Sequence, residues 1–392
     1  MKRSVRLAIV GVFLACAAAA VLALSAIGSA SEGPLSTALG WLGAATGAAE
    51  HRIRDRLSGP GRRETLRWLE PYRESADRLR SPTIVLLGAY DSGIPRTLDG
   101  VLALESTLHA PLPLIQIYSA WGDKPDQQFP LRLLSAIDGL GSIPMVTWEP
   151  WLVDFESVKH PTLPLRDARD RHGLAGVASG AYDFYIDAWA AEAARFRKPF
   201  LIRFAHEMND PYRYPWGPQN NTKEEYIAAW RHVVERFRSA GATNVVWVWS
   251  PHVAYEYWDL YYPGAGYVDW VATGVLNFGP IAQWSQWWSF GEIFGTKYPR
   301  LASFGKPVMV AELGSLAVGG DRAAWYKAAL DSLPSRYPAV RAVLFFHARD
   351  DQTVTYQKVD WTIVSDSALA TAIRRSLDST GLACPRAAGC SR

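Results

Sequence analysis

Apolar residues gather in short runs between residues 83 and 349, and polar, amphipathic stretches separate these runs. Most runs are continuous rather than alternating, which is typical of parallel strands buried on both faces. The runs that predict strands are Thr83–Asp91, Leu112–Trp121, Ile143–Trp151, Pro199–Asn209, Asn244–Pro251, Val268–Phe278, Lys306–Gly314 and Val340–Arg349.

The stretches between these runs predict helices, because their apolar residues recur every three or four positions. The clearest are Tyr182–Arg197, Glu224–Ser239, Asp321–Leu333 and Ser367–Leu377. Eight strands alternating with helices over about 300 residues predict an α/β fold, a (β/α)8 TIM barrel, for which about 250 residues is typical. A doubly wound sheet is the alternative, but no Gly-x-Gly-x-x-Gly turn follows the first run.

Both ends of the chain differ from this pattern. Three basic residues precede the uncharged run Leu7–Ser31, which has the charge order of a secretory signal and also exceeds the roughly 20 residues that span a bilayer. We therefore expect residues 1–31 to be a signal peptide or a hydrophobic membrane anchor, with the remainder exported. The other expected parts are a juxtamembrane spacer at 32–80, the barrel at 81–378 and a tail at 379–392. In that tail, the spacing of Cys384 and Cys390 permits a disulfide in an oxidising compartment.

Composition narrows the class of protein. Hydrophobic residues make up 49% of the chain and charged residues 20%, as in globular proteins. The formal net charge of +3 arises in the N-terminal segment, so the barrel lacks a polybasic footprint and we expect no nucleic-acid partner. The 17 Trp, 17 Tyr and 14 Phe indicate either a large aromatic core or a cleft lined with flat rings for sugars.

Candidate chemistry lies at the carboxyl ends of the strands, where barrel enzymes place their active sites. Glu207 and Glu312 lie near the ends of the fourth and seventh apolar runs. A buried carboxylate without a partner is costly, so each glutamate has either a structural ion-pair or capping role or a chemical one. Other polar and aromatic groups at the strand ends are candidates for binding a polyhydroxylated ligand. They are Tyr90, Trp121, Trp148, Arg203, His206, Asn209, Trp249 and His347.

Two carboxyl groups converging on one aromatic cleft are what glycosidic hydrolysis requires, one as acid and one as nucleophile or base. Other chemistries lack their motifs: the sequence has no His-Glu-x-x-His, no Gly-x-Ser-x-Gly and no phosphate-binding P-loop. Its eight histidines are scattered. We therefore expect no metal and no organic cofactor.

Several segments together carry a resemblance to a known family. Arg203–Asn209, followed by Tyr214-Pro215-Trp216-Gly217, resembles the acid/base segment of glycoside hydrolase family 26, and Val310–Gly314 resembles its nucleophile strand. The resemblance covers roughly residues 83–350. Further matching segments are Thr147–Pro150, Gly180–Asp183 and Tyr262–Gly264 leading to Val268–Val271.

The resemblance implies a retaining enzyme on a (β/α)8 barrel, with Glu207 as acid/base and Glu312 as nucleophile. It further implies that Arg203 and His206 orient the site and contact the sugar, and that Trp216 forms a sugar platform. Family members cleave β-mannans, mixed-linkage β-1,3-1,4-glucans or β-1,3-xylans. The Tyr-Pro-Trp-Gly segment is closer to the glucanase branch.

Two departures from the family pattern bear on function. Leu276 stands near the place where the family usually has a tyrosine that hydrogen-bonds the nucleophile, and Asp210 replaces a common glycine. We expect a retaining endo-glycoside hydrolase that cleaves a β-linked polysaccharide, with β-glucan favoured before mannan. The alternatives are a catalytically silent polysaccharide-binding barrel associated with exopolysaccharide export, and a transglycosylase. The oligomeric state stays open.

Overall fold

The computed structural model describes residues 61–355 and 357–383. The expected signal or anchor segment, most of the expected spacer and the pair Cys384 and Cys390 lie outside the described residues. Within the described ranges, no helix is long and apolar enough to span a lipid bilayer.

The strands form a closed parallel barrel in chain order, in which β1 pairs with both β2 and β8. Each predicted apolar run overlaps one strand, and only β7 extends past its run, by one residue, so the predicted barrel is confirmed. The strands are β1 (Leu86–Asp91), β2 (Leu114–Ala120), β3 (Ile143–Glu149), β4 (Phe200–Phe204), β5 (Val245–Trp249), β6 (Trp270–Asn277), β7 (Val308–Ser315) and β8 (Val340–His347).

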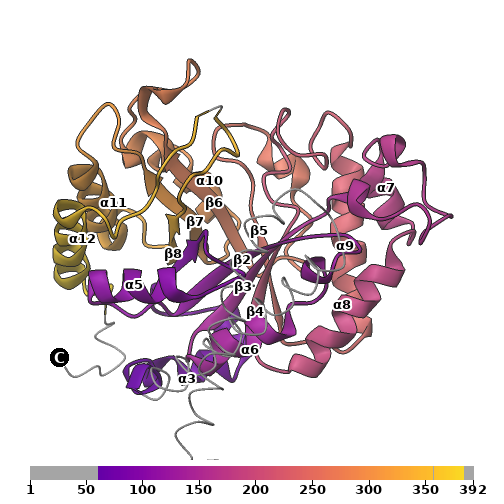
Figure 1. Cartoon of the computed structure of the whole chain (residues 1–392), viewed down its shortest axis with the longest axis horizontal. Helices are drawn as coiled ribbons and strands as arrows, with labels where there is room; N and C mark the ends of the chain where they lie inside the picture. The colour runs from indigo at the N-terminus through magenta and orange to yellow at the C-terminus, as the bar shows by residue number, and fades with distance from the viewer. Residues whose placement is uncertain (1–60, 356, 384–392) are drawn as a thin grey trace, which may run out of the picture. The chain divides into compact units, whose positions relative to one another are not determined.

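Helices surround the barrel, with α11 and α12 on one side of the strands and α8 and α9 on the other (Figure 1). The four helices predicted from periodicity are confirmed as α8, α9, α11 and α12. Thr222 and Glu225 form a capping box at the start of α9, which satisfies backbone donors that a helix end leaves free. The helices are α5 (Asp99–Leu108), α6 (Leu131–Gly139), α7 (Gly173–Ala178), α8 (Asp183–Phe196), α9 (Lys223–Ser239), α10 (Tyr298–Ser303), α11 (Arg322–Arg336) and α12 (Ser367–Thr380).

Alternate residues of each strand belong to two different cores. In β5, Val246 and Val248 lie in the cluster that fills the barrel, whereas Trp247 and Trp249 lie in the larger cluster between strands and helices. Successive strand side chains point to opposite faces. This alternation decides which residues at the strand ends face the barrel interior.

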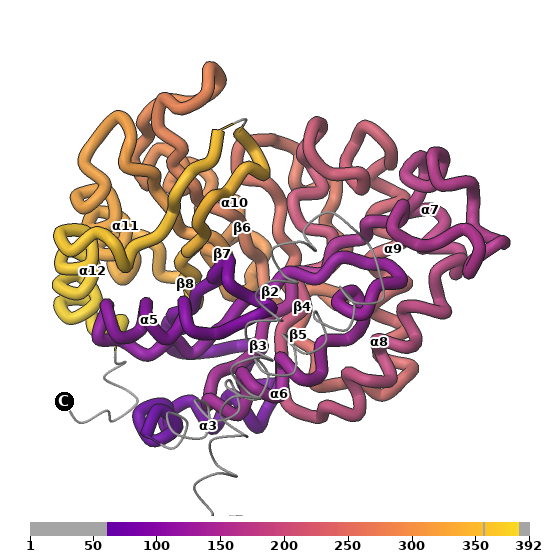
Figure 2. The backbone as a smooth tube through the Cα atoms, viewed as in Figure 1, coloured from indigo at the N-terminus to yellow at the C-terminus, as the bar shows by residue number. Residues whose placement is uncertain are grey.

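The expected boundary between the spacer at 32–80 and the barrel at 81–378 is wrong. Residues 61–80 pack onto the barrel instead of forming a spacer. The segment forms η2 (Arg67–Leu69), α3 (Glu70–Arg73) and α4 (Ala76–Arg80), and α3 lies below the strands (Figure 2). Leu79 is buried with the barrel interior, and its carbonyl accepts a hydrogen bond of 2.9 Å from Trp270 Nε1. The many arginines of this segment conceal its few apolar anchors, so the sequence pattern resembled a spacer.

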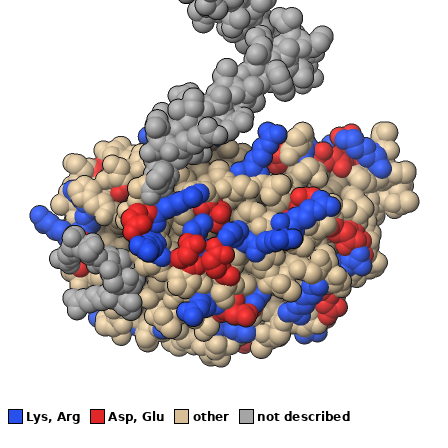
Figure 3. Space-filling model, turned by 90° about the horizontal axis from the view of Figure 1, so that it is seen from below, with Lys and Arg blue, Asp and Glu red and all other residues tan. Residues whose placement is uncertain are grey.

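The surface beneath the barrel carries charges of both signs. Figure 3 shows Lys and Arg interspersed with Asp and Glu on this face. Arg73 of α3, for example, pairs with Asp138 of α6 at 2.7 Å. This face therefore lacks the uniformly basic surface that binds a phosphate backbone.

Candidate active site

A bulge in β7 directs Glu312 into the barrel mouth. Thr273 of β6 lies opposite Val310, but the next residue, Gly274, lies opposite Glu312, so Ala311 is the extra residue. A bulge bends its strand and re-aims the side chains beside it. Glu312 consequently contacts inward-facing residues from β2 and β4.

The absence of a side chain at Gly274 leaves room between the two candidate carboxylates. A Cβ atom at this position would lie 3.4 Å from Oε2 of Glu312 and 3.7 Å from Oε1 of Glu207. These two oxygens are therefore at most about 7 Å apart, which is compatible with the separation of about 5–5.5 Å between the carboxyl groups of retaining glycosidases. The sequence prediction that β4 and β7 bring the two glutamates together is met by this geometry.

Glu312 is buried and tightly held. Its Oε1 accepts hydrogen bonds of 2.5 Å from Nη2 of Arg203 and 2.7 Å from the hydroxyl of Tyr118. Burial alone would raise the pKa of Glu312, but the charge of Arg203 and the two hydrogen bonds outweigh it and lower that pKa. Glu312 is therefore ionised at neutral pH, and its Oε2 remains directed toward Gly274.

Tyr118 is a site residue that the sequence analysis missed. It reaches Glu312 from β2, while Leu276 stands near the position where the family usually has its tyrosine. Burial and the nearby charge of Glu312 raise the pKa of Tyr118 well above its usual value, so the phenol keeps its proton and donates it. The signal that could have identified Tyr118 is its position in β2, where every second side chain faces the barrel interior.

Glu207 lies in a turn instead of a strand. Ala205 and Glu207 both adopt positive φ, 41° and 54°, which is costly for residues other than glycine. The backbone N–H of Glu207 donates to the carbonyl of Ser250 at 2.7 Å, which anchors the turn to the end of β5. Strained backbone of this kind is often found at functional sites.

The carboxylate of Glu207 has looser partners than that of Glu312. Arg213 Nη1 lies 3.5 Å from Oε2, and Nε2 of His252 lies 4.0 Å from Oε1. Both partners come from loops, since Arg213 follows β4 and His252 follows β5. Glu207 therefore lacks the close ion pair that holds Glu312.

His206 and Trp216 belong to a buried aromatic cluster beside the site. His206 Nε2 lies 3.1 Å from the hydroxyl of Tyr214, and burial, with Arg203 and Arg213 nearby, lowers the pKa of His206 well below its usual value. Trp216 stacks on Tyr214 at 4.5 Å and donates a hydrogen bond to the carbonyl of His206. Because Trp216 is only 2% exposed, the expectation that it forms an open sugar platform is wrong.

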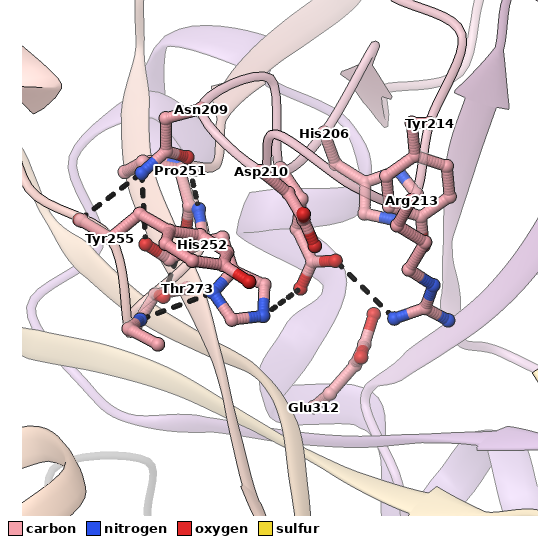
Figure 4. A network of polar contacts seen from close by, with 12 residues as sticks. His206, Asn209, Asp210, Arg213, Tyr214, Pro251, His252, Tyr255, Thr273 and Glu312 are labelled. Carbon is pink, nitrogen blue, oxygen red and sulfur yellow. Dashed lines mark hydrogen bonds and ion pairs between the residues drawn. The ribbon is translucent and has the colours of Figure 1, made fainter. Parts of the chain in front are cut away.

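Asn209 holds two loops together. Its Nδ2 donates to the carbonyls of His252 and Tyr255, at 3.1 and 3.2 Å, and its Oδ1 accepts from the N–H of His252 at 2.7 Å. Figure 4 shows this cluster beside Asp210, with Glu312 on the other side. Asn209 therefore positions His252. The sequence predicted that Asn209 would offer its amide to a ligand, but the amide is already used in these hydrogen bonds.

Three tryptophans expected to bind substrate belong instead to the core. Trp121, Trp148 and Trp249 are fully buried in the cluster between strands and helices. Trp148 packs on Trp121 and Trp189, with both ring-centroid distances 4.6 Å. They occupy outward-facing or post-strand positions, so the prediction that they line the cleft is wrong.

Tyr90 and His347 come from neighbouring strands, but only Tyr90 faces the barrel interior. Tyr90 faces inward and meets Tyr118 edge-on at 4.8 Å, so it lies beside the candidate site as expected. In β8, His347 points outward, as do Val343 and Phe345. Its Nδ1 lies 2.8 Å from Oδ2 of Asp91. The expected contact of His347 with substrate does not fit this placement.

Glu149 is a third carboxyl group that the sequence analysis missed. It ends β3 on the inward side, next to the outward-facing Trp148, and its Oε2 accepts a hydrogen bond of 3.2 Å from Trp151 Nε1. Burial raises the pKa of Glu149 to about 7, against the opposing effects of the Trp151 hydrogen bond and of Arg203. Applying the strand alternation to β3 would have selected Glu149 over Trp148.

Glu207, Asp210 and His252 lie close enough to suggest a cation site, since their ligand atoms are all within 4.8 Å of one another. The backbone N–H of Ala254, however, donates to Nδ1 of His252 at 3.1 Å. A neutral ring in this position carries its proton on Nε2, the atom that faces Glu207. Metal binding at Nε2 needs the opposite tautomer, so we assign these residues to hydrogen bonding.

Comparisons with known proteins agree with this geometry. The family model for glycosyl hydrolase family 26 matches residues 177–302. Endoglucanase H of Acetivibrio thermocellus is 33% identical over 252 residues, which are 62% of this chain and 25% of that protein. A mannan endo-1,4-beta-mannosidase of Caldalkalibacillus mannanilyticus is 29% identical over 177 residues, 43% of this chain and 31% of that protein. The chain thus spans less than a third of either relative.

A solved structure supports the fold. A family 26 β-mannanase from Bacteroides ovatus superposes with a TM-score of 0.55 at 17% identity, over 81% of this chain and 93% of that one. A closed (β/α)8 barrel with paired glutamates after β4 and in β7 defines the class of barrel glycosidases. Within that class, the chain is similar to glycosyl hydrolase family 26, whose model matches its residues 177–302.

Proposed function

We propose that the protein is a retaining endo-glycoside hydrolase that cleaves a β-linked polysaccharide, with β-glucan favoured before mannan. The observation that carries this proposal is the pair of carboxylates around Gly274, one tightly ion-paired and the other loosely held. Two carboxyl groups with such different surroundings suit two different roles in one reaction.

In the first step, Glu312 acts as nucleophile. Arg203 and Tyr118 hold Oε1, so Oε2 attacks the anomeric carbon and forms a glycosyl ester. The bond from that carbon to the leaving oxygen breaks, and Glu207 gives its proton to this oxygen. Arg203 and Tyr118 fix the direction of attack, and positioning of this kind lowers the barrier.

In the second step, Glu207 acts as base. Its carboxylate takes a proton from water, whose oxygen attacks the anomeric carbon and displaces Oε2 of Glu312. The sugar is released with its original configuration, and Glu207 is protonated again. Neutral His206 adds no positive charge that would compete for the carboxylate.

Exposed rings in the loops after β5 and β6 support action on a long chain. Tyr257, in the loop after β5, is 70% exposed, and Trp284, in the loop after β6, is 56% exposed. Trp284 packs edge-on against Phe278 at 5.2 Å. Flat apolar faces with polar edges suit sugar rings, so these exposed rings support binding of several sugars of one chain.

The preference for β-glucan rests on two supports. The match to the relative named an endoglucanase covers 62% of this chain, and the match to the mannosidase covers 43%. The segment Tyr214-Pro215-Trp216-Gly217 also favours the glucanase branch. Tyr118 meanwhile weakens the case for a silent binding barrel, since the missing tyrosine at Leu276 was the reason for that alternative.

The experiment is hydrolysis of mixed-linkage β-glucan, β-mannan and β-1,3-xylan by the full chain, with Glu312→Ala as the matched control. We expect new reducing ends from β-glucan with the wild type alone, and β-configured products in the first minutes by proton NMR. Binding to a polymer without cleavage would support the silent barrel. Longer products from a defined oligosaccharide would support a transglycosylase.

We also propose that the chain is exported, with residues 1–31 as signal peptide or retained anchor. This proposal rests on the charge and hydropathy of the sequence. N-terminal sequencing of the protein from extracytoplasmic fractions tests it, because a cleaved signal would give a new N-terminus near residue 31. Recovery of the chain only from the cytoplasm would contradict it.

A further inference from the structure

Glu149 is a carboxyl group at the barrel mouth that the proposed mechanism does not use. It is the last residue of β3 and lies on the inward side of that strand. Two residues earlier, Thr147 also faces inward, and its hydroxyl accepts a hydrogen bond of 3.0 Å from Nε of Arg203. Two residues of a strand rise by roughly 6.6 Å, so Glu149 stands above the level at which Arg203 holds Glu312, toward the opening.

The protein uses only one oxygen of this carboxyl group. Oε2 of Glu149 accepts the 3.2 Å hydrogen bond from Nε1 of Trp151, and Trp151 is itself held edge-on against Trp216 at 5.3 Å. Among the residues that the structure describes, none donates a hydrogen bond to Oε1. Ala120 of β2, the register partner of Glu149, has only a methyl side chain. Because Glu149 is only partly buried, Oε1 is open to a ligand in the mouth.

Charges in the mouth act on Glu149 from several elements. Burial raises its pKa to about 7, and the charge of Glu312 in β7 contributes to that rise. Opposing effects come from the Trp151 hydrogen bond and from Arg203 and Arg213. Glu149 is therefore protonated in part of the molecules at neutral pH. A protonated carboxyl group both donates and accepts hydrogen bonds, as a sugar hydroxyl group does, and it adds no second negative charge above Glu312.

A sugar ring placed over Glu312 lies against Glu149. Oε1 of Glu312 is held between Tyr118 of β2 and Arg203 of β4, and these are the two strands that flank β3. The carboxyl group of Glu312 thus lies below the end of β3, where Glu149 stands one level higher. A ring whose anomeric carbon is within reach of Oε2 of Glu312 therefore has its hydroxyl groups near the open oxygen of Glu149.

We propose that Glu149 is a substrate-binding residue that hydrogen-bonds one ring hydroxyl group of the glucose unit that Glu312 attacks. This inference rests on the proposed function, since the nucleophile fixes where that sugar lies. Trp151 holds Oε2 and so orients the carboxyl group, and Oε1 meets the hydroxyl group. The site thereby selects a sugar with a hydroxyl group at that position, and analogues that lack it react more slowly.

The test removes the partners of this hydrogen bond one at a time. Values of kcat/KM are measured with the full chain for 4-nitrophenyl β-cellobioside and for analogues that lack the 2-, 3- or 6-hydroxyl group of the attacked glucose. The variants are Glu149→Ala and Glu149→Gln, whose amide also donates and accepts hydrogen bonds. Glu156→Ala is the matched control, because Glu156 is an exposed carboxylate further along the chain after β3, where it pairs with Lys159.

We expect Glu149→Ala to lose about tenfold in kcat/KM on the parent substrate, the worth of one such hydrogen bond, and to match the wild type on one deoxy analogue. Glu149→Gln should stay within about threefold of the wild type, and Glu156→Ala should be unchanged. Comparing substrates within one variant cancels any loss of folded protein. An equal loss on every substrate would show a structural role and overturn the inference, as would no loss on the parent substrate.

Binding to an inactive variant separates this inference from the proposed function. Calorimetry with Glu312→Gln protein and a β-1,3-1,4-linked gluco-tetrasaccharide reports binding without cleavage. About tenfold weaker binding by the Glu149→Ala/Glu312→Gln variant would support the hydroxyl contact even if the wild type cleaves no glycan. Unchanged affinity, or no binding of the tetrasaccharide to either protein, would overturn the inference, whatever the wild type cleaves.

Discussion

The two glutamates differ in how firmly the protein holds them. Glu312 belongs to a strand, is buried, and has Arg203 and Tyr118 at 2.5 and 2.7 Å. Glu207 belongs to a strained turn, and Arg213 and His252 stand 3.5 and 4.0 Å away. A nucleophile benefits from fixed direction and a retained charge, whereas an acid/base must change protonation twice per turnover. The difference in surroundings thus matches the difference between the two proposed roles.

Removing each carboxylate should have different consequences. Glu312→Ala is expected to abolish cleavage of every substrate, a loss of at least about 10⁴-fold in kcat, because no nucleophile remains. Glu207→Ala should lose about 10²–10⁴-fold on polysaccharide but keep the first step on a dinitrophenyl glycoside, whose leaving group needs no proton. Stopped-flow release of dinitrophenol measures this. A burst with Glu312→Ala, in place of Glu207→Ala, would reverse the assignment.

Arg203→Met should remove the charge that keeps Glu312 ionised. Breaking a buried pair leaves an uncompensated charge and costs about 3–5 kcal/mol. The pKa of Glu312 is lowered in the folded protein, so its stabilising contribution is present above the unfolded pKa and is lost as pH falls through the folded value. In the variant, burial without this partner raises the pKa of Glu312, so the acid limb of activity should move to higher pH, and the loss of stability that the wild type shows on acidification should shrink. Unchanged acid limbs in both profiles would contradict the pairing.

Tyr118→Phe removes only one of the two hydrogen bonds to Glu312. We expect roughly a tenfold loss of kcat, since a hydrogen bond to a charged group contributes about 1.5–3 kcal/mol, and the acid limb of the kcat profile should move up. Tyr90→Phe is the control, because its ring stands edge-on to Tyr118 and the change keeps that ring. Equal loss in both variants would show a packing effect instead.

Glu149→Gln tests the third carboxyl group. The pKa of Glu149 is raised to about 7, so the folded state disfavours its ionisation, and the resulting stability is present at low pH and lost as pH rises toward 7. The shift corresponds to about 3 kcal/mol at most. Chemical denaturation of the wild type should show a decline in stability between about pH 4.5 and 7, and that decline should be smaller in the variant. Parallel curves would contradict the assignment.

Local patterns in the sequence predict the strands, four helices and the two glutamates, because apolar runs and strand ends are short-range features. What they do not predict is the direction of side chains in continuously apolar strands, where Trp148 and Glu149 look equally suited to a cleft. Tyr118 was missed because its partner Glu312 is 194 positions away and the bulge at Ala311 sets its direction. Leu79 likewise contacts Trp270 across the closed end of the barrel.

The most direct test of the account is to trap the glycosyl-enzyme. The full chain is incubated with a 2-deoxy-2-fluoro β-glucosyl or cellobiosyl substrate that has a good leaving group, and the labelled peptide is sequenced by mass spectrometry. The account predicts one label, on Glu312, and no label in Glu312→Ala. A label on Glu207, or turnover of polysaccharide to products of inverted configuration without any label, would contradict it.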